Sequence, residues 1–262
     1  MKSLLYHLRR LPELIRWRNP GLFLLLVIRE IFRPLMYWYV FDIFERDVRR
    51  PLPEPYSKER LDVRIYEGTE DLKKAVQELT SLDNLGPEEI EQRLKRGDAV
   101  AVAYSGREAV SCMWLTFSSG MELAFDTSWV ISPMEALRYG SFVRPEWRGR
   151  AIHSFVNDAI NRYARERGMV RTLAGISALN SQSRNLTKRL RSLQVMKVFL
   201  FHLRGVNWTY RRAIGAPLHS RFSITTGPSP MRSGLHSSDR RLENHSLALP
   251  PDVPRLTKHR GF

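Results

Sequence analysis

Residues 142–153 constrain the fold of this chain more than any other part of its sequence. They read Phe-Val-Arg-Pro-Glu-Trp-Arg-Gly-Arg-Ala-Ile-His, the pattern of a strand that passes through a short turn into a long helix. The first amides of a helix have no partner within the helix and carry the positive end of its dipole. Such a junction predicts a pyrophosphate cradle, in which Arg148 and Arg150 add positive charge and Gly149 and Ala151 keep the approach to the backbone open.

The elements around this junction predict a mixed domain over residues 61–212. Ser105-Gly106 joins two strands as a hairpin, Gly86-Pro87 opens a helix, and Gly168 ends another. We expect strands at 63–66, 98–104, 109–117, 137–143, 170–177, 195–203 and 206–211, and helices at 71–79, from Gly86 onward, at 149–167 and at 181–191.

At this junction the sequence resembles the GNAT superfamily of acetyl-CoA-dependent N-acetyltransferases. The pyrophosphate-loop signature of that family is Arg or Gln, two residues, Gly, one residue, then Gly or Ala, often preceded by Val-x-Pro-Glu and an aromatic residue. The matching residues are Val143, Pro145, Glu146, Trp147, Arg148, Gly149, Arg150 and Ile152. Two positions depart from the pattern, because Ala151 stands at the second conserved glycine and His153 stands where Gly or Ala is usual.

The resemblance covers residues 61–212 and continues in a helix opened by Asn180, with Ser183, Leu186 and Leu190 at the family's spacing. It implies an α+β fold with a central mixed, mostly antiparallel sheet flanked by helices. It also implies acetyl-CoA as co-substrate and no metal. The residues it assigns to the cofactor are Phe142, Val143, Arg148, Gly149, Arg150, Ala151, Ile152, His153, Asn180 and Ser183.

The resemblance further implies direct attack of a neutral amine on the thioester, polarised by amides of the strand that ends at residues 142–143 and splays from its neighbour. Glu135 falls where some family members carry the general base, although it also fits a solvated turn. Tyr139 is the other polar candidate on that strand, where packing is the alternative. The family's usual acid, a tyrosine, is replaced here by Thr187.

The single cysteine, Cys112, excludes an intramolecular disulfide and any zinc site built on several thiolates. It lies among apolar strand residues, which indicates a buried thiol. Trp114, two residues on, fits either the core or the wall of an acceptor pocket. Four of the seven histidines lie after residue 213 without acidic neighbours, which gives no metal-binding pattern.

A formal charge of +15 indicates a polyanionic partner, and residues 144–212 carry +12 of it, from 15 basic and 3 acidic residues. The acetyltransferase prediction therefore has an alternative from another class, a non-catalytic basic module that binds an anionic membrane or nucleic acid. No zinc finger or aromatic RNA-binding strand is present in the sequence, which makes nucleic acid the less favoured partner. The sequence does not specify the acceptor amine.

The two ends of the chain differ from its middle. Residues 1–50 predict an amphipathic, aromatic and basic helical extension, 51–60 a Pro-rich linker, and 213–262 a disordered Pro/Ser-rich tail. The apolar runs before residue 48 are too short to span a bilayer. We expect residues 1–48 to lie in an anionic membrane interface, with residues 37–39 at headgroup level, and place the protein in the cytoplasm at the inner face of the membrane. Packing on the domain and formation of a homodimer are the alternatives.

Overall fold

We describe the fold from a computed structural model of the chain. The structure describes residues 28, 36–51, 59–68, 72–82, 85–119, 122–124, 127–203, 206–214 and 223–226. The chain divides into two compact units. Of the described residues, those within 1–46, 119–132 and 173–231 form unit 1 and those within 47–118 and 133–172 form unit 2, so the predicted domain at 61–212 contributes to both.

Strands predominate among the described elements, with helices between β2 and β3 and on either side of β8. In order, they are β1 (Met36–Asp47), β2 (Asp62–Glu67), α4 (Leu72–Leu82), α5 (Pro87–Lys95), β3 (Ala99–Ser105), β4 (Glu108–Thr116), β5 (Glu122–Ala124), β6 (Thr127–Val130), β7 (Glu135–Val143), the 3-10 helix η1 (Pro145–Trp147), α6 (His153–Glu166), β8 (Arg171–Ser177), α7 (Ser181–Arg189), β9 (Leu193–Leu203), β10 (Val206–Ala213) and β11 (Ser223–Thr226).

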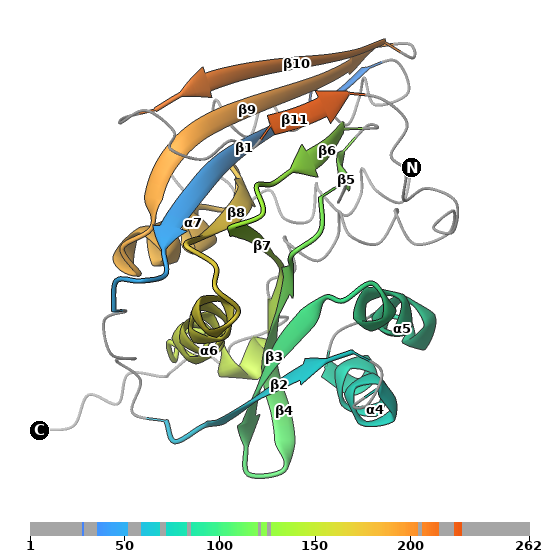
Figure 1. Cartoon of the computed structure of the whole chain (residues 1–262), viewed down its shortest axis with the longest axis vertical. Helices are drawn as coiled ribbons and strands as arrows, with labels where there is room; N and C mark the ends of the chain where they lie inside the picture. Colours follow the sequence, from blue (N-terminus) through green and yellow to red (C-terminus); the bar gives the residue numbers. More distant parts are fainter. Residues whose placement is uncertain are drawn as a thin grey trace, which may run out of the picture. The chain divides into compact units, whose positions relative to one another are not determined.

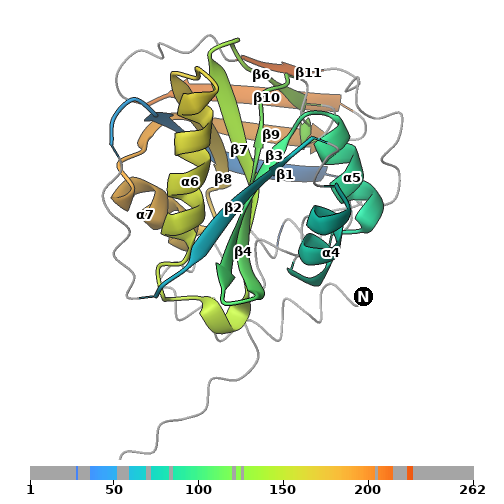
Figure 2. The ribbon, with the colours of Figure 1, turned by 60° about the horizontal axis from the view of Figure 1, so that its bottom comes forward.

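Unit 2 is built on an antiparallel sheet with the strand order β7-β4-β3-β2. Helix α6 lies on one face of this sheet, and α4 and α5 lie on the other (Figure 1; Figure 2). The predicted helix start and hairpin turn are confirmed, since Gly86 is the N-cap of α5 with Pro87 in its first turn, and the β3–β4 hairpin turns at Gly106. This arrangement confirms the predicted α+β class with a mostly antiparallel sheet flanked by helices.

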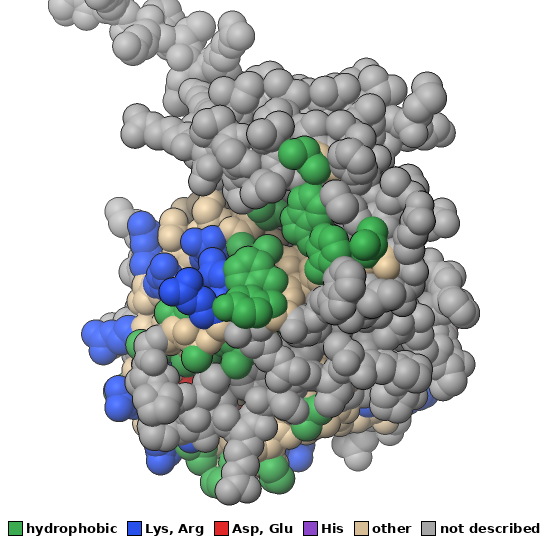
Figure 3. Space-filling model, turned by 90° about the horizontal axis from the view of Figure 1, so that it is seen from above, with side chains coloured by type: hydrophobic (Ala, Val, Ile, Leu, Met, Phe, Trp, Pro, Cys, Tyr) green, Lys and Arg blue, Asp and Glu red, His purple; other side chains and the backbone are tan. Residues whose placement is uncertain are grey.

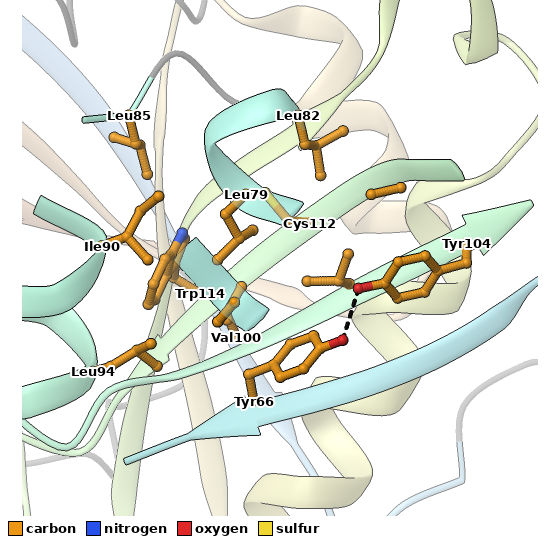
Figure 4. Close-up of a cluster of buried hydrophobic side chains, with 13 residues drawn as sticks. Tyr66, Leu79, Leu82, Leu85, Ile90, Leu94, Val100, Tyr104, Cys112 and Trp114 are labelled. Carbon is orange, nitrogen blue, oxygen red and sulfur yellow. Dashed lines mark hydrogen bonds between the residues drawn. The ribbon is translucent and has the colours of Figure 1, made fainter. Parts of the chain in front are cut away.

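Successive residues of β4 point to opposite sides of the sheet, and all but the first are buried, so both faces of the unit 2 sheet are covered. Cys112 and Trp114, both 0% exposed, join the cluster under α4 and α5. Figure 4 shows Trp114 among the side chains of this cluster, with Ile90 and Leu94 of α5 nearby. Met113 and its neighbours pack against α6 instead. The predicted burial of the Cys112 thiol is therefore confirmed, and the Trp114 side chain lies in the core, where each fully buried large side chain contributes about 1.5–3 kcal/mol.

Unit 1 contains the strand order β10-β9-β1-β8 and a second small sheet, β11-β6-β5. Strand β9 pairs antiparallel with β10 on one side and with β1 on the other. Trp129 of β6 packs so closely over Gly175 of β8 that a Cβ there would lie 2.7 Å from the indole. Glycine is therefore required at this position, although its φ is ordinary.

The prediction of a helical extension over residues 1–50 is wrong for residues 36–47. These residues form β1, whose register with β9 runs from Met36 opposite Leu203 to Glu45 opposite Leu193. The aromatic run at 37–39 belongs to this paired strand, which agrees with the strand preference of aromatic residues. The amphipathic segment before residue 36 lies outside the described residues, apart from residue 28.

The predicted disordered tail is also corrected at one place. Residues 223–226 form β11, which pairs antiparallel with β6 from Ser223 opposite Val130 to Thr226 opposite Thr127. Their sequence, Ser-Ile-Thr-Thr, is rich in β-branched residues, and pairing with another strand offsets the entropy of ordering them. The rest of the predicted tail after residue 214 lies outside the described residues, as do residues 52–58 of the predicted linker.

Most of the predicted elements in the middle of the chain are confirmed within a few residues. The exception that matters for function is the start of the long helix. We predicted residues 149–167, but α6 begins at His153 and residues 148–152 form a turn. The short strands β5 and β6 were not predicted.

Candidate cofactor loop and catalytic residues

The loop between β7 and α6 has an uncommon backbone conformation. Gly149 has a φ of 80° and Ala151 a φ of 60°, so two residues separated by one position lie in the left-handed region. Among the described residues, Ala151 and Arg191 are the only residues other than glycine with positive φ. This conformation costs an alanine roughly 1–2 kcal/mol. A strained alanine next to a left-handed glycine points to a function for the loop backbone.

Left-handed residues alternating with ordinary ones turn successive N–H groups toward one side, which forms a concave anion-binding surface. Among the described residues, no backbone carbonyl accepts a hydrogen bond from the amides of residues 149–152. A Cβ placed on Gly149 would meet nothing within 4 Å. The loop backbone is therefore open to a ligand at the place where the sequence predicts the pyrophosphate.

The two arginines of the loop are differently held. The Nε of Arg148 donates to the carbonyl of Val143 at 3.1 Å, and burial lowers the pKa of its guanidinium from the usual value. Arg150 forms an ion pair with Glu59 at 3.3 Å, and its guanidinium lies 4.9 Å from the ring centroid of Trp147. The Arg148 guanidinium is thus held at the carbonyl that ends β7, whereas that of Arg150 is held by Glu59 and Trp147.

His153, the residue that departs from the family pattern, is the first residue of α6 and is half-buried. Burial, and to a smaller extent the positive charge of Arg138, lowers the pKa of its imidazole from 6.5 to about 4. His153 is therefore neutral at physiological pH and adds no positive charge to the loop. Behind it, the Ser154 hydroxyl donates to the carbonyl of Ala151 at 2.7 Å and supports the strained residue.

Strand β7 contains a bulge just before the loop. Phe142 pairs with Cys112 and Tyr139 pairs with Trp114, so the two residues between them on β7 oppose a single residue of β4. One of them, Gly140, has a φ of 52°. A bulge turns backbone groups out of the regular ladder, which here exposes the segment at 140–141. The predicted splay of β7 from its neighbour concerns both units and stays a prediction.

Glu135 is the first residue of β7 and is 3% exposed. Its carboxylate lies 3.7 Å from a guanidinium nitrogen of Arg171. Eight residue steps separate it from Val143, about 26 Å along an extended strand, so it does not join the cofactor loop itself. The alternative of a solvated turn does not fit this buried carboxylate, and its role as a base stays a prediction.

The phenol of Tyr139 donates a hydrogen bond to Oδ2 of the fully buried Asp98 at 2.5 Å. Burial raises its pKa above the usual value of 10. The nearby Arg96 forms an ion pair with the same carboxylate and lies 3.4 Å from the phenol oxygen. Tyr139 is therefore protonated at physiological pH, and its hydrogen is engaged with Asp98.

In unit 1, Asn180 caps α7 as the sequence predicts. Its side-chain oxygen accepts from the backbone N–H of Ser183 at 3.0 Å. Thr187, which occupies the position of the family's tyrosine, is buried at 7% exposure. The predicted contacts of Asn180 and Ser183 with a cofactor stay predictions.

A buried carboxylate of β1 also holds α7, and sequence reasoning missed it. Asp42 is 0% exposed and lies 3.1 Å from the Nε of Arg184 and 3.3 Å from the Nζ of Lys197. Gln194 donates to it at 2.8 Å. These partners are more than 140 residues away along the chain, so no local pattern could have indicated the network.

Within the described part of the chain, no group of three or more His, Cys, Asp or Glu side chains could hold a metal ion. Over the same residues, no helix combines the length and the apolar character needed to cross a bilayer.

Neither a protein-family model nor a curated protein matches this chain. Among solved structures, it is similar to an acetyltransferase of the GNAT family from Colwellia psychrerythraea, with 13% identity and a TM-score of 0.46, over 64% of this chain and 57% of that one. It is similar to a GCN5-related N-acetyltransferase from Sphaerobacter thermophilus, with 16% identity and a TM-score of 0.45, over 72% of this chain and 57% of that one. An aminoglycoside N-acetyltransferase in complex with CoA shows 18% identity and a TM-score of 0.40, over 49% of this chain and 89% of that one. This chain thus spans less than two thirds of the first two structures.

Proposed function

We propose that this protein is an acyltransferase that uses acetyl-CoA to acetylate a primary amine. The observation that carries the proposal is the loop at 148–152, where Gly149 and a strained Ala151 hold the backbone left-handed between a strand and a helix. Backbone strain of this kind persists where the surrounding structure and function require it. The match of this loop to the GNAT signature supports the same proposal.

The residues present suit a pyrophosphate group. The amides of residues 149–152 have no backbone carbonyl as acceptor among the described residues, and Gly149 leaves the surface open. Arg148, in the same loop, would add a guanidinium to these amides. When bound, acetyl-CoA supplies an activated acetyl thioester.

The proposed role of β7 is to position the acyl group. Backbone N–H groups near the bulge at Gly140 would donate to the thioester carbonyl and stabilise the charge that develops on its oxygen. The acceptor must be a neutral amine, whose attack would form the C–N bond while the C–S bond breaks and coenzyme A leaves as its thiolate. The amine proton has to leave before or during this attack. Glu135 is the proposed base, acting through water because of its distance from the loop. Tyr139 holds a proton that it shares with Asp98.

Acetyl-CoA should raise the melting temperature of the full chain, because a ligand that binds only the folded state stabilises it. Gly149→Val and Arg148→Glu should abolish this shift. Gly168→Val is a matched control, because Gly168 has nearly the same φ, 79°, and equally open surroundings at the other end of α6. An unchanged melting curve of the wild type at millimolar acetyl-CoA would refute the proposal.

We also propose that the protein works at an anionic membrane surface, on the basis of an aromatic and basic face of β9 and β10. Phe199 and Tyr210 are 37% and 62% exposed, with ring centroids 5.7 Å apart. The exposed Arg212 follows on the same side of β10, opposite Lys197, whose ammonium is paired with Asp42. Figure 3 shows hydrophobic side chains next to Lys and Arg side chains on the side viewed from above. Apolar rings bordered by cations suit anionic lipid headgroups.

Liposome flotation tests this second proposal. The full chain should float with anionic vesicles and less so at high salt, and Phe199→Ser with Tyr210→Ser should weaken flotation. If the full chain does not float with the vesicles and is a stable dimer, this face would instead be proposed as the interface of a homodimer. Salt-sensitive binding of nucleic acid without binding of coenzyme A would instead favour the non-catalytic basic module.

A further inference from the structure

The bulge in β7 lies directly over two hydrogen-bond donors. A Cβ placed on Gly140 would lie 3.0 Å from Nη1 of Arg93 and 3.0 Å from Cδ1 of Trp114, the atom bonded to its indole nitrogen. Gly140 itself is exposed. The two side chains therefore lie directly under the backbone of Gly140, at a spacing that leaves no room for a side chain at this position.

Both donors lack a partner. Nη1 of Arg93 and Nε1 of Trp114 are buried and have no hydrogen-bond partner among the described residues. Arg93 is 6% exposed and Trp114 is 0% exposed. A guanidinium and an indole N–H can only donate, so only an acceptor atom satisfies them. Buried donors without partners are uncommon in folded proteins and call for an explanation in terms of a ligand or water.

The surroundings hold Arg93 in place. Its Nη2 donates to Glu89 at 2.5 Å, one turn earlier on α5. Its guanidinium lies 5.0 Å from the ring centroids of both Trp114 and Tyr139. Tyr139 is fixed in turn by its hydrogen bond to Asp98. The guanidinium is thus oriented before any ligand arrives, with Nη1 on the side of Gly140.

We propose that Arg93 and Trp114 bind a carboxylate of the acceptor, so that the protein acetylates amines that also carry a carboxylate, such as amino acids. This rests on the proposed function, in which the backbone at Gly140 lies beside the acyl group. A carboxylate offers acceptor oxygens only and forms strong, charge-assisted hydrogen bonds with a guanidinium. An acceptor with a neutral group at the same place leaves the donors poorly satisfied, which discriminates against it.

The test uses the indole N–H signals of the ¹⁵N-labelled full chain. The chain has six tryptophans, and the signal that disappears in Trp114→Phe belongs to Trp114. The probes are N-acetylated amino acids, which correspond to the products, and the same compounds with the carboxylate converted to an amide. The Trp114 signal should shift on addition of the carboxylates and not the amides, while the other signals stay in place.

Arg93→Met should abolish the response to carboxylates. Lys95→Met is the matched control, because it breaks the comparable pair of Lys95 with Glu91, 3.0 Å apart, on the exposed side of the same helix. In transfer assays, kcat/KM should favour amino acids over their amides by about 10-fold or more, and Trp114→Phe should reduce this ratio without changing the fold.

Equal shifts for carboxylates and amides, or no shift with either, would overturn the carboxylate site. These signals do not depend on acetyl-CoA, so the two proposals fail separately. If acetyl-CoA does not raise the melting temperature but carboxylates shift the Trp114 signal, the proposed activity is refuted and the carboxylate site is kept. Acetyl transfer without preference for carboxylates refutes the site and keeps the activity.

Discussion

Replacing alanine by glycine at one left-handed residue of the cofactor loop, and glycine by alanine at the other, should change the free energy of unfolding in opposite directions. Ala151 has a φ of 60°, a conformation that costs an L-residue roughly 1–2 kcal/mol. Glycine removes this cost but gives the unfolded chain more freedom, which costs about 0.4–1 kcal/mol. Ala151→Gly should therefore raise the free energy of unfolding by about 0.5–1 kcal/mol.

Gly149→Ala should lower the free energy of unfolding by a similar amount. Its φ is 80° and the added Cβ would meet nothing within 4 Å, so the effect is conformational and not a clash. Urea unfolding followed by circular dichroism measures both changes. Ala159→Gly, in the middle of α6, is the control, and its free energy of unfolding should be about 1 kcal/mol below that of the wild type. If Ala151→Gly lowers the free energy of unfolding as Ala159→Gly does, Ala151 is not strained, and its backbone conformation does not point to a function of the loop.

Three further changes test other parts of the structure. The pKa of His153 is about 4 in the folded state and 6.5 in the unfolded state, so the unfolded chain binds more protons between these values and stability falls as the pH drops from 6.5 toward 4. His153→Asn should remove this contribution, about 1–2 kcal/mol at pH 5 for a half-buried ring, and an unaltered difference in unfolding free energy between pH 7 and pH 5 would contradict it. Glu135→Gln should lower turnover by roughly 10²-fold with acetyl-CoA affinity kept, and wild-type turnover would remove Glu135 as the base. A chain ending at Ala213 loses β11 and its pairing with β6, so its melting temperature should fall, whereas an unchanged value would show that β11 adds no stability.

Local patterns were enough to predict the elements of unit 2. The Gly86-Pro87 start of α5, the turn at Gly106 and the end of α6 at Gly168 depend on the backbone preferences of single residues, which act the same way in most folds. The left-handed turn before α6 could not be predicted in detail. Nothing in Arg-Gly-Arg-Ala-Ile states that Ala151 adopts a conformation that alanine normally avoids.

The strand β1 was missed because its apolar residues follow a leucine-rich segment of helical spacing and do not alternate with polar ones. The aromatic and β-branched residues at 37–41 were the signal for a strand, but their partner β9 lies more than 140 residues later in the chain. The contact of Asp42 with Arg184, 142 residues later, was beyond sequence reasoning for the same reason. The contact of Tyr139 with Asp98 spans 41 residues and likewise has no local pattern. Pairing over such separations depends on the fold itself.

The central claim is that the loop at 148–152 binds the pyrophosphate of coenzyme A. Isothermal titration calorimetry of the full chain with coenzyme A, at low and at physiological salt, tests it most directly. We expect one coenzyme A to bind per chain at both salt concentrations, and binding to be lost in Gly149→Val but not in Gly168→Val. Absence of binding at millimolar coenzyme A, or equal binding by Gly149→Val, would contradict it.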